Sequence, residues 1–385
     1  MAANKNNKAL NVPHLRFPGF NGEWEETTLG KISEIKKGSG ISKDQLSEQG
    51  SPCILYGELY TKYKSEIINE VYSRTELDSP SLVKSKANDV IIPCSGETAI
   101  DISTARCIPC NNILLGGDLN IIRLKYDNGG FFAYQLNGAR KKDIARVAQG
   151  VSVVHLYGEN LKQIRVYHPA IEEQKKLAEF IALLDERIAT QNKIIEKLET
   201  LIKALSATVF NSLQGPLILL SKVASIKKGQ QLNGTELEEC GRYYVMNGGV
   251  VPSGYYDEYN TEANTISISE GGNSCGYVQF NTLPFWSGGH CYTLCDIKNE
   301  FINPKYLYHY LKYKEQNIMA LRIGSGLPNI QKKALEQFGI KLPDMTMQNR
   351  IAIALDTITK KFDVENRIKK SYQAQKSYLL SNLFI

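Results

Sequence analysis

The sequence predicts an α+β fold made of two tandem repeats, in which each repeat is a strand-rich domain followed by a long helix. Three observations lead to this prediction. One long stretch of the chain is repeated, short β-type runs are separated by glycine, asparagine and serine clusters, and a regular apolar seam follows each strand-rich part. We expect the two long helices to pair with each other as an antiparallel coiled coil.

The repeat is visible at both ends of the two units. Residues 29–38 (LGKISEIKKG) return as residues 220–229 (LSKVASIKKG), and both stretches end in Ile-Lys-Lys-Gly. Farther along, an offset of 174 residues carries Pro169 onto Pro343 and continues to the ends of the two units. Because a repeat of this length fixes the architecture, we expect the same fold twice.

Within the domains, short elements can be placed by composition. A short helix should begin at Asn303, with Pro304 at its first position, and its counterpart should begin near Asn128. The β-type runs that are bounded by turn-forming residues are 89–93, 120–126, 265–269 and 291–297.

The long helices give the clearest signal. Apolar residues recur in alternating steps of four and three, which is typical of a coiled-coil seam, although amphipathic helices that pack on their own domains are the simpler alternative. We expect strand-rich domains at 15–170 and 215–343, and long helical segments at 171–212 and 344–385. The seam residues are Leu177, Ile181, Leu184, Ile188, Ile195, Leu198, Ile202 and Leu205 in the first helical segment, and Ile351, Leu355, Ile358, Phe362 and Leu379 in the second.

Composition narrows the class of protein. The chain has 385 residues, of which 42% are hydrophobic and 22% are charged, and its net charge of +6 favours an anionic partner only weakly. No apolar run is long enough for a membrane span, so we expect a cytoplasmic protein with no membrane partner. Of the eight cysteines, only Cys107 and Cys110 have a familiar ligand spacing, and we expect buried, unbridged thiols and no metal site.

Several motifs, taken together in their doubled order, carry a family resemblance. They are the opening Arg16-Phe17-Pro18-Gly19-Phe20 with Trp24, the two Ile-Lys-Lys-Gly stretches, the Gly-Ser-Gly at 324–326, and a proline five residues before a glutamine at the start of each long helix. From about Arg16 to Phe384 the chain resembles the specificity subunits of type I restriction-modification systems. The first repeat departs from the pattern, because it has Gln-Gly-Val-Ser at 149–152 where the second has the Gly-Ser-Gly turn.

The resemblance implies two domains that each read one half of a split, asymmetric site in double-stranded DNA, while the helices set the spacer length. It also implies partners: two methyltransferase (modification) subunits and, in the restricting complex, two motor-nuclease (restriction) subunits. This chain itself would bind no cofactor, since S-adenosylmethionine, ATP and Mg²⁺ would be held by those partner subunits.

Candidate DNA-contacting residues are cations for phosphates, and amide, hydroxyl or cationic side chains for base edges. The two Lys-Lys-Gly turns are the strongest candidates because they recur, although a solvated strand end is an equally good explanation. The residues of the first domain are Lys36, Lys37, Lys84, Lys86, Thr98, Arg140, Lys141, Lys142, Arg146 and Ser152, and those of the second are Lys227, Lys228, Gln230, Asn273, Ser274, Arg322 and Ser325.

We predict no catalytic residues. A DNA methyltransferase would need a glycine-rich cofactor loop and an Asn/Asp-Pro-Pro-aromatic motif, and Asn303-Pro304-Lys305-Tyr306 lacks the second proline. There is no phosphate-binding G-x-x-x-x-G-K-[ST] run for ATP. The alternative function is a structural coiled-coil adaptor without DNA recognition, which would leave the duplicated strand-rich domains without a purpose.

Overall fold

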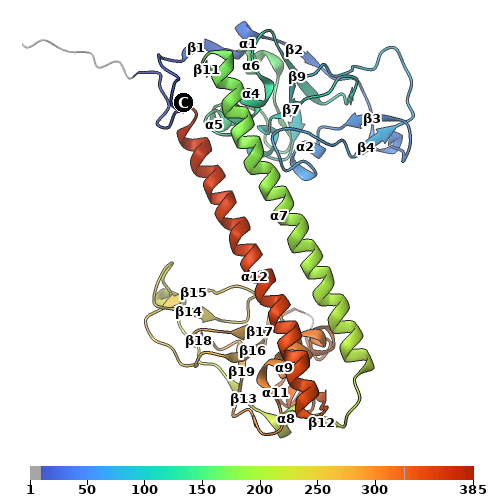
Figure 1. Ribbon diagram of the computed structural model, residues 1–385, viewed down its shortest axis with the longest axis vertical. Coiled ribbons are helices and arrows are strands. Elements are labelled where there is room, and N and C mark those ends of the chain that lie inside the picture. The colour runs from blue at the N-terminus through green and yellow to red at the C-terminus, as the bar shows by residue number, and fades with distance from the viewer. Residues whose placement is uncertain (1–9, 325) are drawn as a thin grey trace, which may run out of the picture. The chain divides into compact units, whose positions relative to one another are not determined.

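The computed structural model describes residues 10–324 and 326–385, which form two compact units (Figure 1). Unit 1 comprises the chain up to Asn192 together with Ile368–Ile385, and unit 2 comprises Lys193–Arg367. Each unit therefore contains one strand-rich domain and a segment of each long helix.

The strand-rich part of unit 1 is built on a four-stranded antiparallel sheet in the order β2-β9-β5-β7. A three-stranded sheet, β4-β3-β8, and the pairs β1-β11 and β6-β10 complete it. Its elements are β1 Glu25–Thr28, α1 Leu29–Ile32, β2 Ser33–Lys37, η1 Lys43–Gln45, β3 Ser51–Ile54, α2 Glu58–Thr61, β4 Ser73–Thr75, β5 Asp89–Pro93, β6 Ser95–Gly96, α3 Ala99–Ile102, β7 Arg106–Ile108, β8 Leu114–Leu115, β9 Leu119–Leu124, α4 Gly129–Asn137, α5 Lys141–Val147, β10 Val154–His155, α6 Gly158–Lys162 and β11 Arg165–His168.

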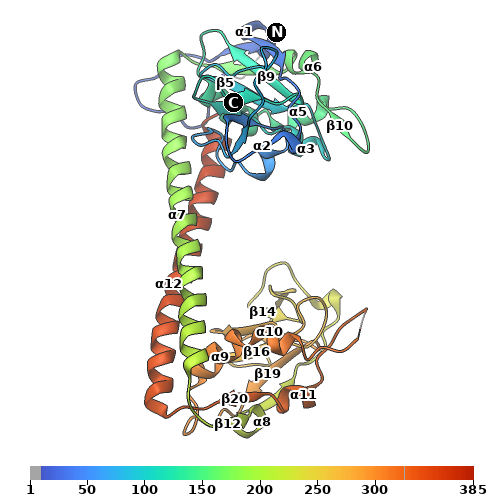
Figure 2. The same cartoon turned by 90° about the vertical axis from the view of Figure 1, so that its right-hand side faces the viewer.

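Unit 2 repeats this pattern of pairing. Its main sheet has the order β13-β19-β16-β17, and a second sheet has the order β15-β14-β18 (Figure 1). The strand β12 pairs with β20 (Figure 2). Its elements are β12 Leu217–Leu219, α8 Leu220–Val223, β13 Ser225–Lys228, η2 Gly234–Glu236, β14 Tyr243–Met246, β15 Gly254–Tyr256, β16 Thr265–Ser269, β17 Val278–Asn281, β18 Trp286–Ser287, β19 Cys291–Cys295, α9 Pro304–Tyr313, α10 Glu315–Met319, α11 Lys332–Glu336 and β20 Gly339–Lys341.

The register shows that the two main sheets are equivalent strand by strand. Lys37 lies opposite Asn120 in unit 1, and Lys228 lies opposite Tyr292 in unit 2. The four strand runs predicted from composition are confirmed as β5, β9, β16 and β19, although β9 and β19 end two residues earlier than predicted. The prediction of the same fold in both repeats is therefore confirmed.

The predicted short helices are also confirmed. Asn128 caps α4, and its side chain accepts a hydrogen bond from Phe131 N at 2.9 Å. Asn303 caps α9 in the same way, with Pro304 at the first helical position. Each cap satisfies backbone donors that the first turn of a helix leaves without partners.

The proline and glutamine before each long helix have a structural reason. Gln174 is 1% exposed, and its amide group donates to the carbonyl of Pro169 at 2.9 Å and accepts from the backbone N–H of the cap Asn128 at 2.9 Å. Gln348 makes the same two bonds, to Pro343 and from Asn303, each at 2.9 Å. The motif thus ties the start of each long helix to the short helix of its own domain.

The two long helices are α7, Ile171–Ser212, and α12, Met345–Asn382. All thirteen predicted seam residues are buried or half-buried in the structure, whereas neighbouring helix positions such as Leu183, Leu201 and Ile353 are exposed. The apolar seam therefore marks the covered side of each helix.

Each unit closes its core with the aromatic end of a long helix. In unit 1 the ring of Phe384, which follows α12, lies 5.3 Å from the ring of Phe131 on α4. In unit 2 Phe210, near the end of α7, packs against Tyr306 and Tyr310 of α9, with ring centroids 6.1 and 5.5 Å away. The core of the first domain is therefore completed by the last residues of the chain.

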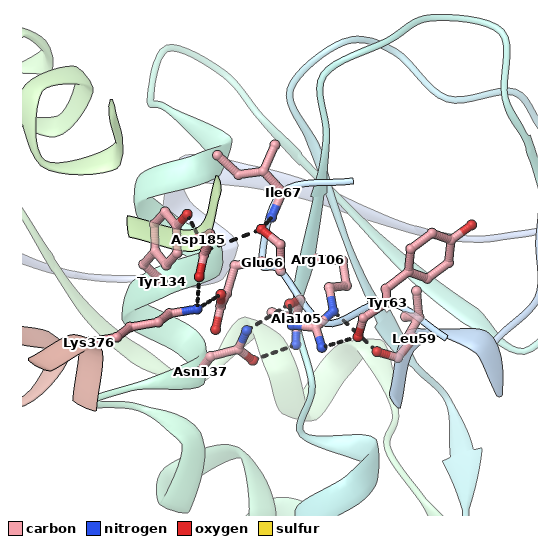
Figure 3. A network of polar contacts seen from close by, with 11 residues as sticks. Leu59, Tyr63, Glu66, Ile67, Ala105, Arg106, Tyr134, Asn137, Asp185 and Lys376 are labelled. Atoms are coloured by element: carbon pink, nitrogen blue, oxygen red, sulfur yellow. Dashed lines mark hydrogen bonds and ion pairs between the residues drawn. The ribbon is translucent and has the colours of Figure 1, made fainter. Parts of the chain in front are cut away.

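A buried ionic network holds the same segment of α12 in unit 1 (Figure 3). Lys376 pairs with both Glu66 and Asp185, and Tyr134 donates its hydroxyl to Asp185 at 2.9 Å. Next to this network Arg106, only 7% exposed, donates to the carbonyls of Leu59 and Tyr63 at 3.1 and 2.9 Å. Burial raises the pKa of Asp185, and the ammonium group of Lys376 opposes that rise.

The prediction that the cysteines are buried is only partly right, because Cys110 and Cys240 are exposed and Cys295 is half-buried. The remaining five thiols are buried. Among the described residues, no helix is long and apolar enough to cross a membrane.

Replacing Lys376 by alanine should lower the free energy of unfolding of unit 1 by about 3 kcal/mol at neutral pH, because it leaves two buried carboxyl groups without their cation. The pKa of Asp185 would then rise further. A carboxyl group whose pKa is higher in the folded than in the unfolded state lowers the free energy of unfolding at any pH above its unfolded pKa. The stability that the variant loses should therefore shrink as the pH falls towards about 4.

Thermal unfolding of the wild type and the variant, at neutral pH and at about pH 5, measures this difference. The matched control is Lys370→Ala, an exposed lysine on the same helix. Equal unfolding temperatures for the two variants would contradict the expectation.

Candidate nucleic-acid interface

The basic turn of unit 1 lies at one end of its main sheet, beside three other turns. Gly38 N donates to Leu119 O at 3.0 Å, Cys94 N donates to Asp118 O at 2.7 Å, and Leu156 N donates to Cys94 O at 2.8 Å. These bonds bring together residues 36–38, 94–98, 116–118 and 149–155, which we call the turn cluster of unit 1.

Unit 2 forms the same arrangement through equivalent bonds. Gly229 N donates to Cys291 O at 2.8 Å, Glu270 N to His290 O at 2.9 Å, and Ile330 N to Glu270 O at 2.8 Å. The turn cluster of unit 2 comprises residues 227–230, 270–274, 288–290, 323–324 and 326–329. Both clusters therefore present a lysine pair, glycine-rich turns and one protruding loop.

The close approach of the turns requires glycine. A Cβ atom on Gly38 would lie 1.9 Å from Gly116 O, and a Cβ on Gly229 would lie 2.3 Å from Gly288 O. Because these distances are far below van der Waals contact, packing at this end of the sheet explains why both Ile-Lys-Lys-Gly stretches end in glycine.

The protruding loop is closed by the same backbone bonds in both repeats even though its sequence differs. Gln149 and His155 exchange backbone hydrogen bonds at 2.9 and 2.7 Å, and Ile323 and Asn329 do so at 2.8 and 3.0 Å. Gly150 and Gly324, one residue into each loop, have φ angles of 121° and 95°. The Gln-Gly-Val-Ser departure in the first repeat therefore leaves these closing bonds intact.

Unit 2 has a hollow of about 500 Å³ in its turn cluster. The residues that line it include Lys228, Asn247, Asn273, His290 and Leu327. The Glu270 side chain, 11% exposed, accepts from Lys228 Nζ at 2.5 Å and from His290 Nδ1 at 3.2 Å. A buried carboxylate thus fixes two partly exposed cationic or polar groups at this surface.

Most of the predicted DNA-contacting residues lie in or directly beside the turn clusters. Thr98 also caps α3, since its side chain accepts from Asp101 N at 3.1 Å. Lys36 pairs with Glu34 at 2.9 Å while both side chains stay more than half exposed. The residues in or beside the clusters are Lys36, Lys37, Thr98 and Ser152 in unit 1, and Lys227, Lys228, Gln230, Asn273, Ser274 and Arg322 in unit 2; Ser325 is outside the described residues.

The other predicted cations lie elsewhere in unit 1. Lys84 and Lys86 precede β5, at the end of that strand opposite to the turn cluster. Arg140, Lys141, Lys142 and Arg146 lie at or on α5. Arg140 donates to the carbonyl of Ile385 at 2.6 Å, and burial lowers the pKa of Lys141, whereas Lys142 and Arg146 are exposed.

Sequence reasoning missed His290, Glu270 and Asp118 as candidates. A signal for two of them is present, because Gly116-Gly117-Asp118 and Gly288-Gly289-His290 occupy equivalent places before β9 and β19. Glu270 was recognised only as part of a turn. Its role becomes visible only when the folded chain brings Lys228 and His290 onto its carboxylate.

The described part of the chain contains no group of three or more histidine, cysteine or acidic side chains that could hold a metal ion. Cys107 is buried, and burial raises the pKa of its thiol to about 12. Such a pKa disfavours the thiolate that binds a metal.

Comparison with known proteins gives a consistent result. The model of the family described as type I restriction modification DNA specificity domain matches residues 21–200 and again residues 219–372. A Mycoplasma genitalium protein named as a type I specificity subunit is 24% identical over 97% of this chain and 96% of its own length. A similarly named Mycoplasma pneumoniae protein is 34% identical over 39% of this chain and 40% of its own length.

The fold has a match among solved structures. The crystal structure of a type I restriction-modification system S subunit from M. genitalium superimposes with a TM-score of 0.76 at 20% identity, and the match covers 97% of this chain and 99% of that one. The duplicated strand-rich domain, each copy with a basic turn cluster, defines a protein with two tandem recognition domains. The chain belongs to the type I restriction-modification DNA specificity family, and both of its repeats match the specificity domain.

Replacing Gly38 by alanine should destabilise unit 1 by about 1–3 kcal/mol, because the added methyl group forces the basic turn away from Gly116. DNA binding should weaken at the same time, since Lys36 and Lys37 move with the turn. Thermal unfolding and a DNA-binding titration measure the two effects.

The matched control is Gly40→Ala, because no atom lies within 4 Å of a Cβ at that position. If both variants behaved like the wild type, the close packing of the turn would have no energetic importance.

Proposed function

We propose that this chain selects the DNA sequence on which a type I restriction-modification complex acts, and that each of its two domains binds one half of a split, asymmetric site. The observation that carries the proposal is the turn cluster, which is built twice on the same backbone but with different side chains. Two copies of one surface with different chemistry suit a target whose two halves differ.

The turn clusters have the groups that DNA binding requires. Lys36, Lys37, Lys227 and Lys228 supply cations for phosphates, and the glycine-rich turns allow the backbone to approach the duplex closely. Exposed polar side chains, such as Ser152 and Asn273, can reach base edges in a groove. In this proposal the phosphate contacts hold the domain on DNA, and the polar side chains give it specificity.

We further propose that α7 and α12 pair antiparallel and fix the gap between the half-sites. Support comes from each unit separately. In unit 1, Asp185 of α7 pairs with Lys376 of α12, and in unit 2, Phe210 of α7 shares a core with Ile351 and Leu355 of α12. The early part of α7 thus lies with the end of α12, and the end of α7 with the start of α12. The shielded seam residues are consistent with this pairing.

The exposed faces of the same helices suit docking of partner subunits. Leu183 is 59% exposed and Ile353 is 69% exposed, and both lie outside the seams. Apolar side chains at such positions leave water when a partner subunit covers them, which favours association. The proposed partners are two modification subunits, which would bind S-adenosylmethionine, and, in the restricting complex, two motor-nuclease subunits, which would use ATP and Mg²⁺.

In this arrangement the chain is not itself catalytic, and it works in the cytoplasm with its DNA. Its contribution is positional, because the bound half-sites determine which bases come within reach of the modification subunits. The adaptor alternative gives the turn clusters no role and is not favoured by the family match.

The methylation pattern of genomic DNA tests the proposal. Cells that express the chain with its modification subunit are compared with cells that lack only the chain. We expect a split, asymmetric motif to lose its methylation when the chain is absent. An active modification subunit whose methylated motifs do not depend on the chain would overturn the proposal and favour the adaptor.

Deleting one heptad from α7 and the facing heptad from α12 tests the spacer. A helix rises about 1.5 Å per residue, so the domains should approach by about 10 Å, which is about 3 base pairs of DNA. We expect the methylated motif to keep both half-sites and to lose about that many base pairs from its gap. As a control, both heptads are replaced by other coiled-coil heptads of equal length, and an unchanged gap after the deletion would contradict the spacer role.

A further inference from the structure

The two turn clusters share a backbone but differ at three positions beside the shared lysine. Equivalent backbone bonds place Cys94 where unit 2 has Glu270, and Asp118 where it has His290. The register of the main sheets places Asn120 where unit 2 has Tyr292. Since the lysine is the same in both clusters, the charged and hydrogen-bonding groups beside it differ because of these three positions.

In unit 2 the acidic residue organises its neighbours. Glu270 is 9% exposed and accepts from Lys228 Nζ and His290 Nδ1, and the Tyr292 hydroxyl lies 3.4 Å from it. Because a carboxylate only accepts hydrogen bonds, Nδ1 of His290 carries the proton, and the Nε2 edge of the ring is left for a ligand. The side chains of Lys228 and His290 are 50% and 61% exposed, so both still face solvent at the hollow.

A lysine that is held in place differs from one that moves freely. A freely rotating lysine acts as a point charge and suits phosphates of any sequence. A lysine fixed on a buried carboxylate directs its remaining donors, which is the requirement for reading a base edge. The base edge with two acceptors in the major groove is that of guanine, with O6 and N7.

We propose that Lys228 and His290, both oriented by Glu270, read a G·C pair in the half-site of the second domain, and that Asp118 reads an amino-bearing base in the half-site of the first. Lys228 donates to O6 or N7 of the guanine, and Nε2 of the His290 ring accepts from N4 of the paired cytosine. This inference rests on the proposed function and assigns the base-reading residues of that surface.

In unit 1 the residues equivalent to Glu270 and His290 are Cys94 and Asp118. Cys94 is buried, and burial raises the pKa of its thiol to about 11, so it provides no carboxylate to hold Lys37. Among the described residues the structure shows no ion pair for Lys37 or Asp118, and both are exposed. An exposed carboxylate accepts hydrogen bonds, as from N4 of cytosine or N6 of adenine, and a free Lys37 suits the neighbouring phosphate.

A purely structural role for the Glu270 cluster fits the geometry less well. A partly exposed ion pair contributes little to stability, and the groups that Glu270 holds remain half exposed beside Asn247 and Asn273. The side chains of the hollow thus supply further donors and acceptors next to the fixed pair.

The experiment uses the full chain assembled with its modification subunits and a pool of DNA duplexes that is randomised over both half-sites and the gap. Bound duplexes are sequenced for the wild type and for Lys228→Gln, His290→Ala and Asp118→Asn. Lys222→Ala is the matched control, because this exposed lysine lies before β13, at the other end of that strand from Lys228. Thermal unfolding of each variant verifies that it is folded.

We expect Lys228→Gln and His290→Ala to reduce the preference for guanine about tenfold at one position of the second half-site, with the first half-site unchanged. Asp118→Asn should alter one position of the first half-site only. Lys222→Ala should select the wild-type motif.

Variants that weaken binding equally for all sequences would show that these residues contact phosphates, and the inference would be wrong. An unchanged motif in all three variants would also overturn it. In both cases a split motif selected by the wild type leaves the proposed function standing, whereas failure of the wild type to select any split motif would be a failure of the proposed function itself.

Discussion

The end of α12 in the core of unit 1 is the contact on which the first domain depends. Phe384 packs its ring on Phe131, and one turn of helix earlier the chain is held by Leu379 and Leu380 beside the same core. Lys376 adds an ionic contact to Glu66 and Asp185. A domain that begins near the start of the chain thus requires the last residues of the chain before its core is closed.

Unit 2 satisfies the same requirement with the end of α7, since Phe210 takes the place of Phe384 among the aromatic residues of α9. The ionic network of unit 1 adds polar specificity to this apolar contact. Two buried carboxylates accept only a cation placed between them, so Lys376 favours one register of α12 against unit 1. The apolar seam by itself would tolerate a shift of one heptad more readily.

In the turn clusters the repeated backbone fixes the shape of the surface, and the side chains, which differ between the repeats, determine which groups it can bind. Glycines at 38 and 229 are fixed by packing, because any Cβ there would overlap a carbonyl oxygen of the neighbouring turn. The exposed positions around them have no such constraint and can differ between repeats without cost to the fold. A surface of this kind keeps its shape while its chemistry changes, as the exchange of Asp118 for His290 illustrates.

The sequence by itself determined the architecture, because hydrophobic periodicity, caps and the internal repeat are local signals that survive in the linear chain. It identified α4 and α9 by their asparagine caps, the main strands by their β-branched runs, and the seams by their spacing. It also placed Lys37 and Lys228 at equivalent turns.

What the tertiary structure decided is which side chains meet across those turns. Cys94 and Glu270 are unremarkable residues after a strand until long-range strand pairing sets one beside Asp118 and the other beside His290 and Lys228. Contacts between residues far apart in sequence arise only from folding, so no local pattern could assign the acid that orients the lysine, or the helix end that closes the first core.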